Sequence, residues 1–314
     1  MNWLESSLQA VPHPAPESVD PNLRATVQTS GYKIVQLANG VHSVHSLAHR
    51  ETFHPVIGPV AEAEALYVNQ LRLAERLHHH GGEFVIWDVG LGAAANALTV
   101  LRATREIPST IRLVSFDNTM EPLHFALRHA EALDYFHDYQ NCAQHLIPHR
   151  RVSFLNGAQT VEWKLHLADF PALLAHSQSH LPARILPPPH AIMFDAFSPA
   201  KNPAMWTLPL FTTLFQLLDR ARPCALPTYS RSTMLRVTLL LAGFFVGVGH
   251  ATGEKEETTL AANTLDLINE PLDRNWLQRA NNSTSAEPLW ESEYRQSPLS
   301  QATREKLAQH PQFK

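Results

Sequence analysis

The sequence predicts an α/β protein built on an open, mostly parallel β-sheet, preceded by a small α+β cap. Short apolar runs rich in Val, Ile and Phe alternate with segments of helical pattern, and strands that read as continuous apolar runs are buried on both faces by crossover helices. The chain has 314 residues, 44% of them apolar, enough to build a substantial core. We expect an arm and cap over residues 1–80, a Rossmann-like domain over 81–263, and a polar tail over 264–314.

The first 80 residues predict an arm followed by a small cap. Residues 1–30 are rich in proline and polar residues, which predicts a loose arm. Residues 32–44 alternate around the turn signal Asn39-Gly40 and predict a β-hairpin. Residues 62–77 have helical spacing. Together these elements predict the α+β cap.

The main sheet is predicted from six apolar runs and the helical segments between them. The runs cover residues 84–90, 111–117, 151–157, 191–197, 224–230 and 244–250. Helical patterns cover residues 93–105, 121–136, 205–222 and 232–241, and residues 258–263 can add a final antiparallel strand. Because Pro227 cannot donate to a ladder, the fifth strand must be short, bulged or at an edge there. Residues 264–314 show no apolar repeat and predict a partly ordered tail.

Charge and composition exclude several classes of protein. Lys and Arg number 25 against 29 acids, which excludes a strongly basic coat but permits a local basic patch. The longest apolar stretch, 237–248, is too short to cross a hydrocarbon core of ~30 Å. The N-terminus does not read as a secretory signal. The chain has two cysteines, which predicts a reducing, cytoplasmic setting. His78–His80 read as a solvated helix end, so we expect no bound metal. The short apolar stretch likewise predicts no membrane partner.

A glycine turn follows the first strand of the main sheet, in the sequence DVGLGAAAN at residues 88–96. Gly90 and Gly92 allow a tight turn and close approach of a ligand, and the same letters satisfy the dinucleotide motif G-x-G-x-x-A. Asp88 favours S-adenosylmethionine, because a carboxylate there can accept a hydrogen bond from its ammonium group but repels a pyrophosphate. Asp117 ends the second strand, where it can accept from both ribose hydroxyls of either cofactor. Its alternative role is a helix cap.

The most specific segment is FDAFSPAKNPAMW at residues 194–206. Together with ETFH at 51–54, G-x-x-x-E-A at 58–63, the glycine turn and TYSRS at 228–232, it resembles the MnmC-like methyltransferase family. That family comprises the methyltransferase domain of the bifunctional tRNA 5-methylaminomethyl-2-thiouridine enzyme and its stand-alone relatives. The resemblance runs from about residue 32 to 263. It implies a class I S-adenosylmethionine-dependent fold and methyl transfer to the aminomethyl nitrogen of wobble uridine in tRNA.

The resemblance also implies roles for particular residues. Asp195, which ends the fourth strand, is the candidate that orients the acceptor ammonium and receives its proton. By resemblance, substrate contacts are expected at Glu51 and His54. Lys201 and Asn202 lie in an exposed, Pro-flanked loop, where substrate or phosphate contact and a solvated turn are both open. Cofactor contacts are expected at Asp88, Gly90, Gly92, Asn96, Asp117, Asn118, Gly157 and Ala158. The chain shows no sign of the FAD-dependent oxidoreductase half, which implies a stand-alone methyltransferase.

Three departures from the family pattern leave other functions open. Ala94 replaces a glycine of the turn, Gly157-Ala158 stands where relatives have Gly-Asp, and residues 253–257 are acidic where relatives are basic. A methyltransferase acting on a small amine or a protein, and a binding module without turnover, therefore remain alternatives, with NAD-dependent hydride transfer the least favoured. A local excess of cations predicts an RNA-facing patch; its members are Lys201, Arg220, Arg222, Arg231 and Arg236.

Overall fold

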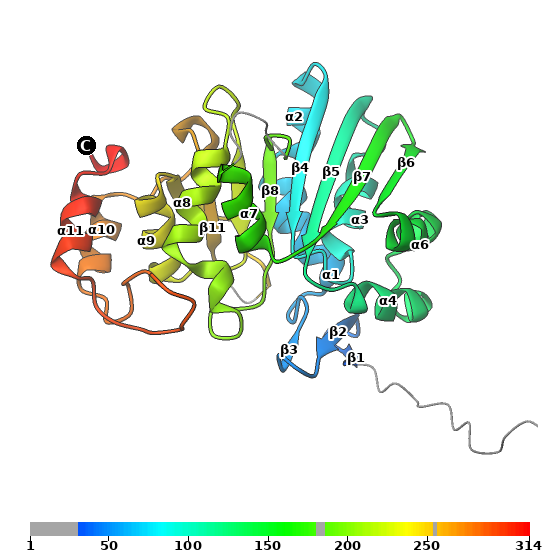
Figure 1. The fold of residues 1–314 in the computed structure, drawn as a ribbon, viewed down its shortest axis with the longest axis horizontal. Helices are drawn as coiled ribbons and strands as arrows, with labels where there is room; N and C mark the ends of the chain where they lie inside the picture. The colour runs from blue at the N-terminus through cyan, green and yellow to red at the C-terminus, as the bar shows by residue number, and fades with distance from the viewer. Residues whose placement is uncertain (1–30, 180–185, 254–255) are drawn as a thin grey trace, which may run out of the picture. The chain divides into compact units, whose positions relative to one another are not determined.

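The computed structural model of the chain describes residues 31–179, 186–253 and 256–314. Its centre is an eight-stranded sheet in the order β10-β11-β9-β8-β4-β5-β7-β6, with a separate three-stranded sheet β1-β2-β3 (Figure 1). The expected arm at residues 1–30 lies outside the described residues.

The parallel part of the main sheet confirms the predicted fold class. Its strands are β4 (Glu83–Val89), β5 (Ser109–Asp117), β7 (Gln159–Leu167), β8 (Ala191–Phe194) and β9 (Ala225–Thr228). β4 lies between β5 and β8 and pairs with both in parallel. β11 (Thr258–Ala262) is antiparallel to both of its neighbours, β9 and β10 (Phe245–Gly249). β9 has only four residues, so Pro227 is accommodated in a short strand inside the sheet.

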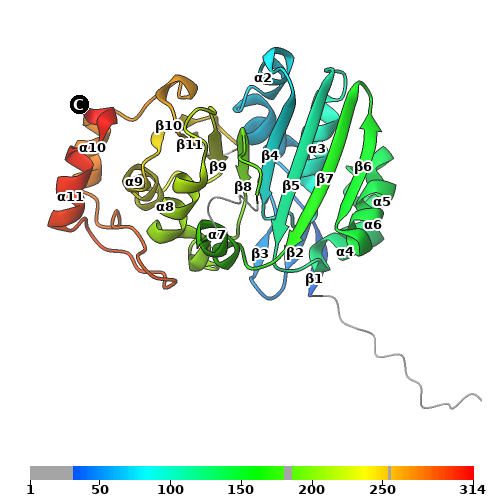
Figure 2. The same cartoon turned by 45° about the horizontal axis from the view of Figure 1, so that its top comes forward.

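The third predicted strand needs a correction. Residues 151–157 form β6 (Arg151–Asn156), which is the antiparallel edge strand, and the parallel partner of β5 is β7. Figure 2 shows β4, β5, β7 and β6 side by side. The sequence pattern does not indicate β7, because buried and exposed positions alternate along most of this strand. It therefore lacks the continuous apolar run expected of a parallel strand.

Helices cover both faces of the sheet and create two cores. Phe84 and Ile86 of β4 belong to one core, whereas Val85, Trp87 and Val89 belong to the other, as the two-residue period of a strand requires. The first core includes residues of α3 (Ala95–Thr104), α4 (Glu121–Arg128), α5 (Ala130–Leu133) and α6 (Gln140–His149). The second includes residues of α7 (Phe170–Ser179), α8 (Leu208–Leu217) and α9 (Thr233–Ala242).

The cap begins with the predicted hairpin. β1 (Tyr32–Gln36) pairs with β2 (His42–Ser46), and β3 (Glu51–Thr52) extends the sheet. The single helix expected over 62–77 is instead three pieces: α1 (Pro59–Ala63), a π-helix η1 (Glu64–Asn69) and α2 (Leu73–His79). The break occurs at Arg72, whose φ of 51° is left-handed. A π-helical turn contains one residue more than an α-helical turn. The α-helical period of the apolar residues therefore does not indicate the π-helix.

Residues 264–314 are packed, which corrects the expectation of a partly ordered tail. They contain α10 (Arg274–Asn281), α11 (Gln301–Ala308) and short 3₁₀ turns. Leu272, Trp276, Leu307 and Phe313 enter the second core, and Leu272 N–H donates to the Val246 carbonyl of β10 at 3.0 Å. These apolar residues are too few and too widely spaced to form a repeat. In the described segments, no helix combines the length and apolarity that a bilayer span requires.

Candidate active site

A cavity of about 520 Å³ lies where β4, β5, β7 and β8 end, beside β3 of the cap. This is the carboxyl edge of the sheet, where ligands bind in open α/β folds. Segments that line it are 49–55 of the cap, 89–93 at the end of β4, 116–119 at the end of β5, 168–170 after β7 and 195–198 after β8. The cavity is the size of a typical cofactor site.

The glycine turn brings the ends of β4 and β8 together. Gly90 has a φ of 94°, and a Cβ there would lie 2.6 Å from the Asp195 carbonyl oxygen. Gly92 also has a positive φ, and its Cβ would meet the Phe53 ring at 3.1 Å. Ala94 has a left-handed φ of 65°, a conformation that imposes strain on an alanine.

Asp117 holds this turn in addition to lining the cavity. Its Oδ2 accepts from Gly92 N–H at 2.9 Å, and its Oδ1 accepts from Thr119 N–H at 3.1 Å. Burial raises the pKa of Asp117, an effect that the backbone donors partly offset. The contact with Thr119 N–H closes a turn before α4, whose N-cap residue is Met120 without a side-chain cap, so the expected helix-cap role is not observed. The carboxylate can still accept a hydrogen bond from a ligand hydroxyl. Asn118 lies beside it in the cavity wall.

Asp88 is buried behind the cavity and is not among the residues of its wall. The Ser115 hydroxyl donates to Oδ2 at 2.7 Å, while Oδ1 has no hydrogen-bond partner among the described residues. Burial raises the pKa of Asp88 to about 7, although the Ser115 hydrogen bond opposes this change. Contact between this carboxylate and the cofactor stays a prediction.

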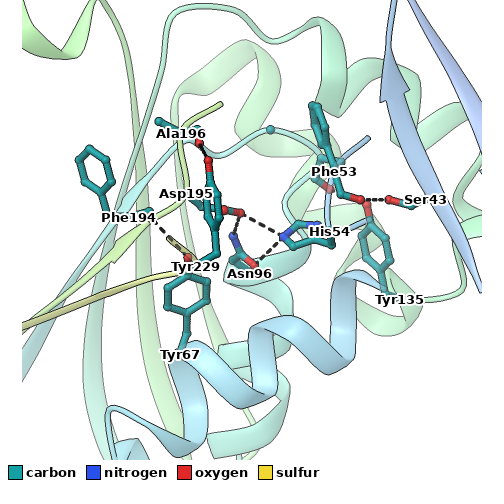
Figure 3. A network of polar contacts seen from close by, with 12 residues as sticks. Ser43, Phe53, His54, Tyr67, Asn96, Tyr135, Phe194, Asp195, Ala196 and Tyr229 are labelled. Carbon is teal, nitrogen blue, oxygen red and sulfur yellow. Dashed lines mark hydrogen bonds and ion pairs between the residues drawn. The ribbon is translucent and has the colours of Figure 1, made fainter. Parts of the chain in front are cut away.

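The other end of the cavity contains three polar residues in mutual contact (Figure 3). Asp195 Oδ2 lies 2.7 Å from Asn96 Nδ2 and 3.0 Å from His54 Nε2, and the same His54 nitrogen lies 3.1 Å from Asn96 Oδ1. Burial by itself lowers the pKa of His54, but the carboxylates of Asp195 and Glu62 raise it, and the result is about 9. His54 is therefore an imidazolium at neutral pH.

The cap is joined to the loop after β8 at the cavity. Glu51 accepts hydrogen bonds from the backbone N–H and the hydroxyl of Ser198. Asn202 lines the cavity, whereas Lys201 is exposed and does not. Trp206 is fully buried and donates to the Phe197 carbonyl at 2.7 Å, so it anchors this loop and offers no stacking surface for a base.

The structure corrects two sequence expectations about binding. Gly157 and Ala158 form the turn between β6 and β7, where Ala158 N–H donates to the Arg105 carbonyl at 2.8 Å. That turn is at the opposite edge of the sheet from the cavity, because Gln159 pairs with Ser109 at the start of β5. The expected five-cation patch is also dispersed. Arg236 is buried in a salt bridge with Glu257 (N···O 3.1 Å), and Arg222 donates to the Pro188 carbonyl before β8.

Sequence reasoning missed several residues of the wall. Asp169 follows β7 and lines the cavity, and finding it required identifying that alternating strand. Glu62 lay within the quoted G-x-x-x-E-A motif, and Tyr229 within TYSRS, but neither spacing shows that the side chain lies at the cavity. Phe53 required knowledge of how β3 folds over the glycine turn.

The residues present fit S-adenosylmethionine better than a dinucleotide. The turn at Gly90 leaves space beside the backbone that a Cβ would fill, and Asp117 offers acceptors suited to ribose hydroxyls. Five carboxylates line the cavity, those of Glu51, Glu62, Asp117, Asp169 and Asp195. These acids outnumber the cations of the lining, Arg50 and His54, so a cationic sulfonium and ammonium suit the cavity better than a pyrophosphate does.

Comparisons with known proteins agree with this geometry. Residues 137–264 match a family described as S-adenosyl-L-methionine-dependent methyltransferase. The chain is 31% identical over 202 residues to the tRNA 5-methylaminomethyl-2-thiouridine biosynthesis bifunctional protein MnmC of Aeromonas salmonicida, covering 59% of this chain and 28% of that protein. It is 26% identical over 246 residues to the protein of the same name from Pseudomonas putida, covering 75% of this chain and 35% of that one.

The chain thus spans about a third of the length of these curated relatives. A solved structure, MnmC2 from Aquifex aeolicus, covers 90% of this chain and 85% of its own, with a TM-score of 0.65 and 21% identity, which shows a shared fold. The resemblance inferred from the motifs is confirmed: the chain is related to the MnmC proteins, has the fold of the class I methyltransferases, and matches a family of S-adenosyl-L-methionine-dependent methyltransferases over residues 137–264.

Proposed function

We propose that the protein transfers a methyl group from S-adenosylmethionine to the nitrogen of an aminomethyl group on the wobble uridine of tRNA. The observation that carries this proposal is the Asp195 carboxylate, held by His54 and Asn96 at the acidic end of the cofactor cavity. The names of the relatives, which refer to biosynthesis of 5-methylaminomethyl-2-thiouridine in tRNA, support this choice of acceptor. A tRNA substrate is also consistent with the cytoplasmic setting expected from the cysteine usage.

The acidic lining suits an amine acceptor. An aminomethyl group is largely an ammonium at neutral pH, and the carboxylates of Asp195, Glu51 and Glu62 attract a cation to this end of the cavity. Asp195 then accepts the proton that the nitrogen must lose, which leaves a lone pair to react. The bound cofactor supplies an electrophilic methyl group. The nitrogen lone pair forms the new N–C bond while the electrons of the C–S bond pass to sulfur.

Positioning accounts for most of the expected acceleration. Alignment of two bound reactants can lower a barrier by ~7–11 kcal/mol in well-oriented systems. We expect the ends of β4, β5 and β8 to provide this alignment, since Gly90 follows β4, Asp117 ends β5, Asp195 follows β8, and β4 pairs with both other strands. Around the cavity, the exposed side chains of Arg50 and Lys201 are the expected contacts for phosphates next to the modified nucleotide, with strong salt dependence.

A methyl-transfer assay on two kinds of acceptor tests this proposal. The first acceptor is tRNA that carries the unmethylated aminomethyl wobble uridine, and the second is the corresponding mononucleoside amine. We expect methyl incorporation into the tRNA at the wobble position, and loss of incorporation in Asp195→Asn. An exposed acid outside the cavity provides the matched control, Asp138→Asn.

The other outcomes distinguish the alternatives. Methylation confined to the mononucleoside would replace tRNA with a small amine as the acceptor. Methylation of neither, combined with micromolar binding of S-adenosylmethionine in a calorimetric titration, would favour a binding module without turnover. Micromolar binding of S-adenosylmethionine that is lost in Asp117→Ala would support a ribose held by the Asp117 carboxylate.

A further inference from the structure

We propose that His54 is a positioning residue: it holds the Asp195 carboxylate in one orientation for methyl transfer and does not itself contact the acceptor. This inference rests on the proposed function only in taking Asp195 as the group that meets the acceptor amine, whichever amine that is. It differs from the expectation drawn from the sequence, which placed His54 among the substrate contacts.

The backbone around Asp195 is held on both sides and at its own amide. The Asp195 N–H donates to the Val89 carbonyl at 2.9 Å. The hydroxyl of Tyr67, from η1, donates to the carbonyl of the preceding residue Phe194 at 3.4 Å, and the hydroxyl of Tyr229 donates to the carbonyl of the following residue Ala196 at 2.9 Å. With the main chain held in this way, the freedom that remains is rotation of the Asp195 side chain.

Two donors on one oxygen remove that rotation (Figure 3). Asn96 Nδ2 donates to Asp195 Oδ2 at 2.7 Å, which directs Asn96 Oδ1 towards His54. Because both neighbours of His54 Nε2 are then acceptors, that nitrogen carries a hydrogen and donates to them at 3.0 and 3.1 Å. Losing His54 would remove one of the two donors that, among these three residues, hold Oδ2, and would therefore loosen the orientation of the carboxylate.

His54 is itself fixed by the cap. Its φ of 49° is left-handed, a conformation that a residue with a side chain adopts only when its surroundings impose it. Its side chain is 8% exposed, compared with 16% for Asp195. The Asp195 carboxylate is thus the more accessible member of the pair. This is consistent with Asp195 contacting the acceptor while His54 holds the carboxylate by a hydrogen bond on its buried side.

The charge of His54 serves the same purpose. The acids that act on it are Asp195, from the end of β8, and Glu62, from α1. Two carboxylates in a buried site would otherwise favour protonation of one of them. An imidazolium in contact with Asp195 offsets this repulsion and holds the carboxylate by charge as well as by a hydrogen bond.

The test compares His54→Ala and His54→Gln with the wild-type protein, and uses His42→Gln, in β2 of the same cap sheet, as the matched control. We expect His54→Ala to lower kcat about 100-fold, the loss that a small misplacement can cause, with the dissociation constant of S-adenosylmethionine changed less than threefold. His54→Gln keeps an amide donor but no charge, so it should recover part of kcat and shift the acidic limb of the pH profile to higher pH. An altered fold alone would not move this limb. Unchanged kcat and pH profile in both variants would overturn the proposal.

A crystal structure of His54→Ala with S-adenosylhomocysteine provides a readout that needs no acceptor. We expect the Asp195 carboxylate to rotate away from its wild-type position while the Asn96 side chain stays in place. An unmoved carboxylate would overturn the proposal even if kcat falls. A rotated carboxylate, in a protein that methylates no amine in the wild-type form, would instead leave the positioning role standing and reject the proposed function.

Discussion

The contact between His54 and Asp195 predicts how the stability of the protein depends on pH. The pKa of His54 is about 9 in the folded protein, compared with 6.5 for an ordinary histidine. One pKa unit corresponds to about 1.4 kcal/mol, so the difference of 9 − 6.5 = 2.5 units corresponds to about 3 kcal/mol of folding free energy. The His54 side chain is 8% exposed, so solvent screening removes little of this value.

The sign follows from which state binds the proton more tightly. A histidine whose pKa is raised by folding contributes its full stabilisation below the unfolded pKa, near pH 6.5, and loses it as the pH rises through about 9. The variant His54→Gln has no group that titrates at this position. The free energy of unfolding of the wild type minus that of His54→Gln should therefore fall by about 3 kcal/mol between pH 6.5 and pH 9.5.

Urea unfolding at a series of pH values measures this difference directly. Taking the difference between the two proteins cancels most titrations that they share, including that of Asp88. The slope of the free energy against denaturant must stay the same in both proteins for the comparison to hold. A difference that is constant from pH 6.5 to pH 9.5 would refute the assignment of an imidazolium to His54.

Three other substitutions test the remaining structural conclusions. Gly90→Ala should lower the free energy of unfolding by about 2–4 kcal/mol, because the positive φ and a contact of 2.6 Å with the backbone both oppose a Cβ. The control Gly81→Ala, where no atom lies within 4 Å of the added Cβ, should lower it much less. Equal losses in the two variants would contradict the packing of the turn. Asp117→Ala should weaken calorimetric binding of S-adenosylmethionine about 10- to 100-fold, the effect of losing charge-assisted hydrogen bonds, whereas unchanged affinity would place the ribose elsewhere. Trp276→Ala should lower the free energy of unfolding by about 3–5 kcal/mol, because this side chain lies in the second core and is only 7% exposed. Trp290 is 50% exposed, so Trp290→Ala should have little effect. Similar small losses in both variants would argue against a packed C-terminal segment.

The sequence was sufficient where a structural feature depends on residues close together in the chain. The glycine turn, the hairpin at Asn39-Gly40 and the strands rich in Val, Ile and Phe follow from local backbone preferences and local burial patterns. The shared location of Asp117 and Asp195 also follows from the sequence, because the carboxyl ends of parallel strands meet at one edge of the sheet. The distinctive segment at residues 194–206, together with the shorter motifs, indicated the relationship to the MnmC proteins.

Features that depend on long-range contacts required the tertiary structure. β7 alternates like a half-exposed strand, so its place beside β5 and the position of Asp169 could not be read from its pattern. Because β7 was not recognised, Gly157 was expected at the carboxyl edge of the sheet, whereas its turn lies at the opposite edge. Residues 264–314 lack a repeat because their few apolar side chains fill gaps in a core that other segments create.

The arrangement of the reactive end shows this division most clearly. His54 and Asp195 are 141 positions apart in the chain, and the sequence identified each of them as a candidate without relating one to the other. Their hydrogen bond exists because the cap folds over the edge of the sheet and places an otherwise unfavourable left-handed residue beside the end of β8. Local preferences determine which elements form, but the burial of two charges against each other is decided only when distant segments pack and exclude water.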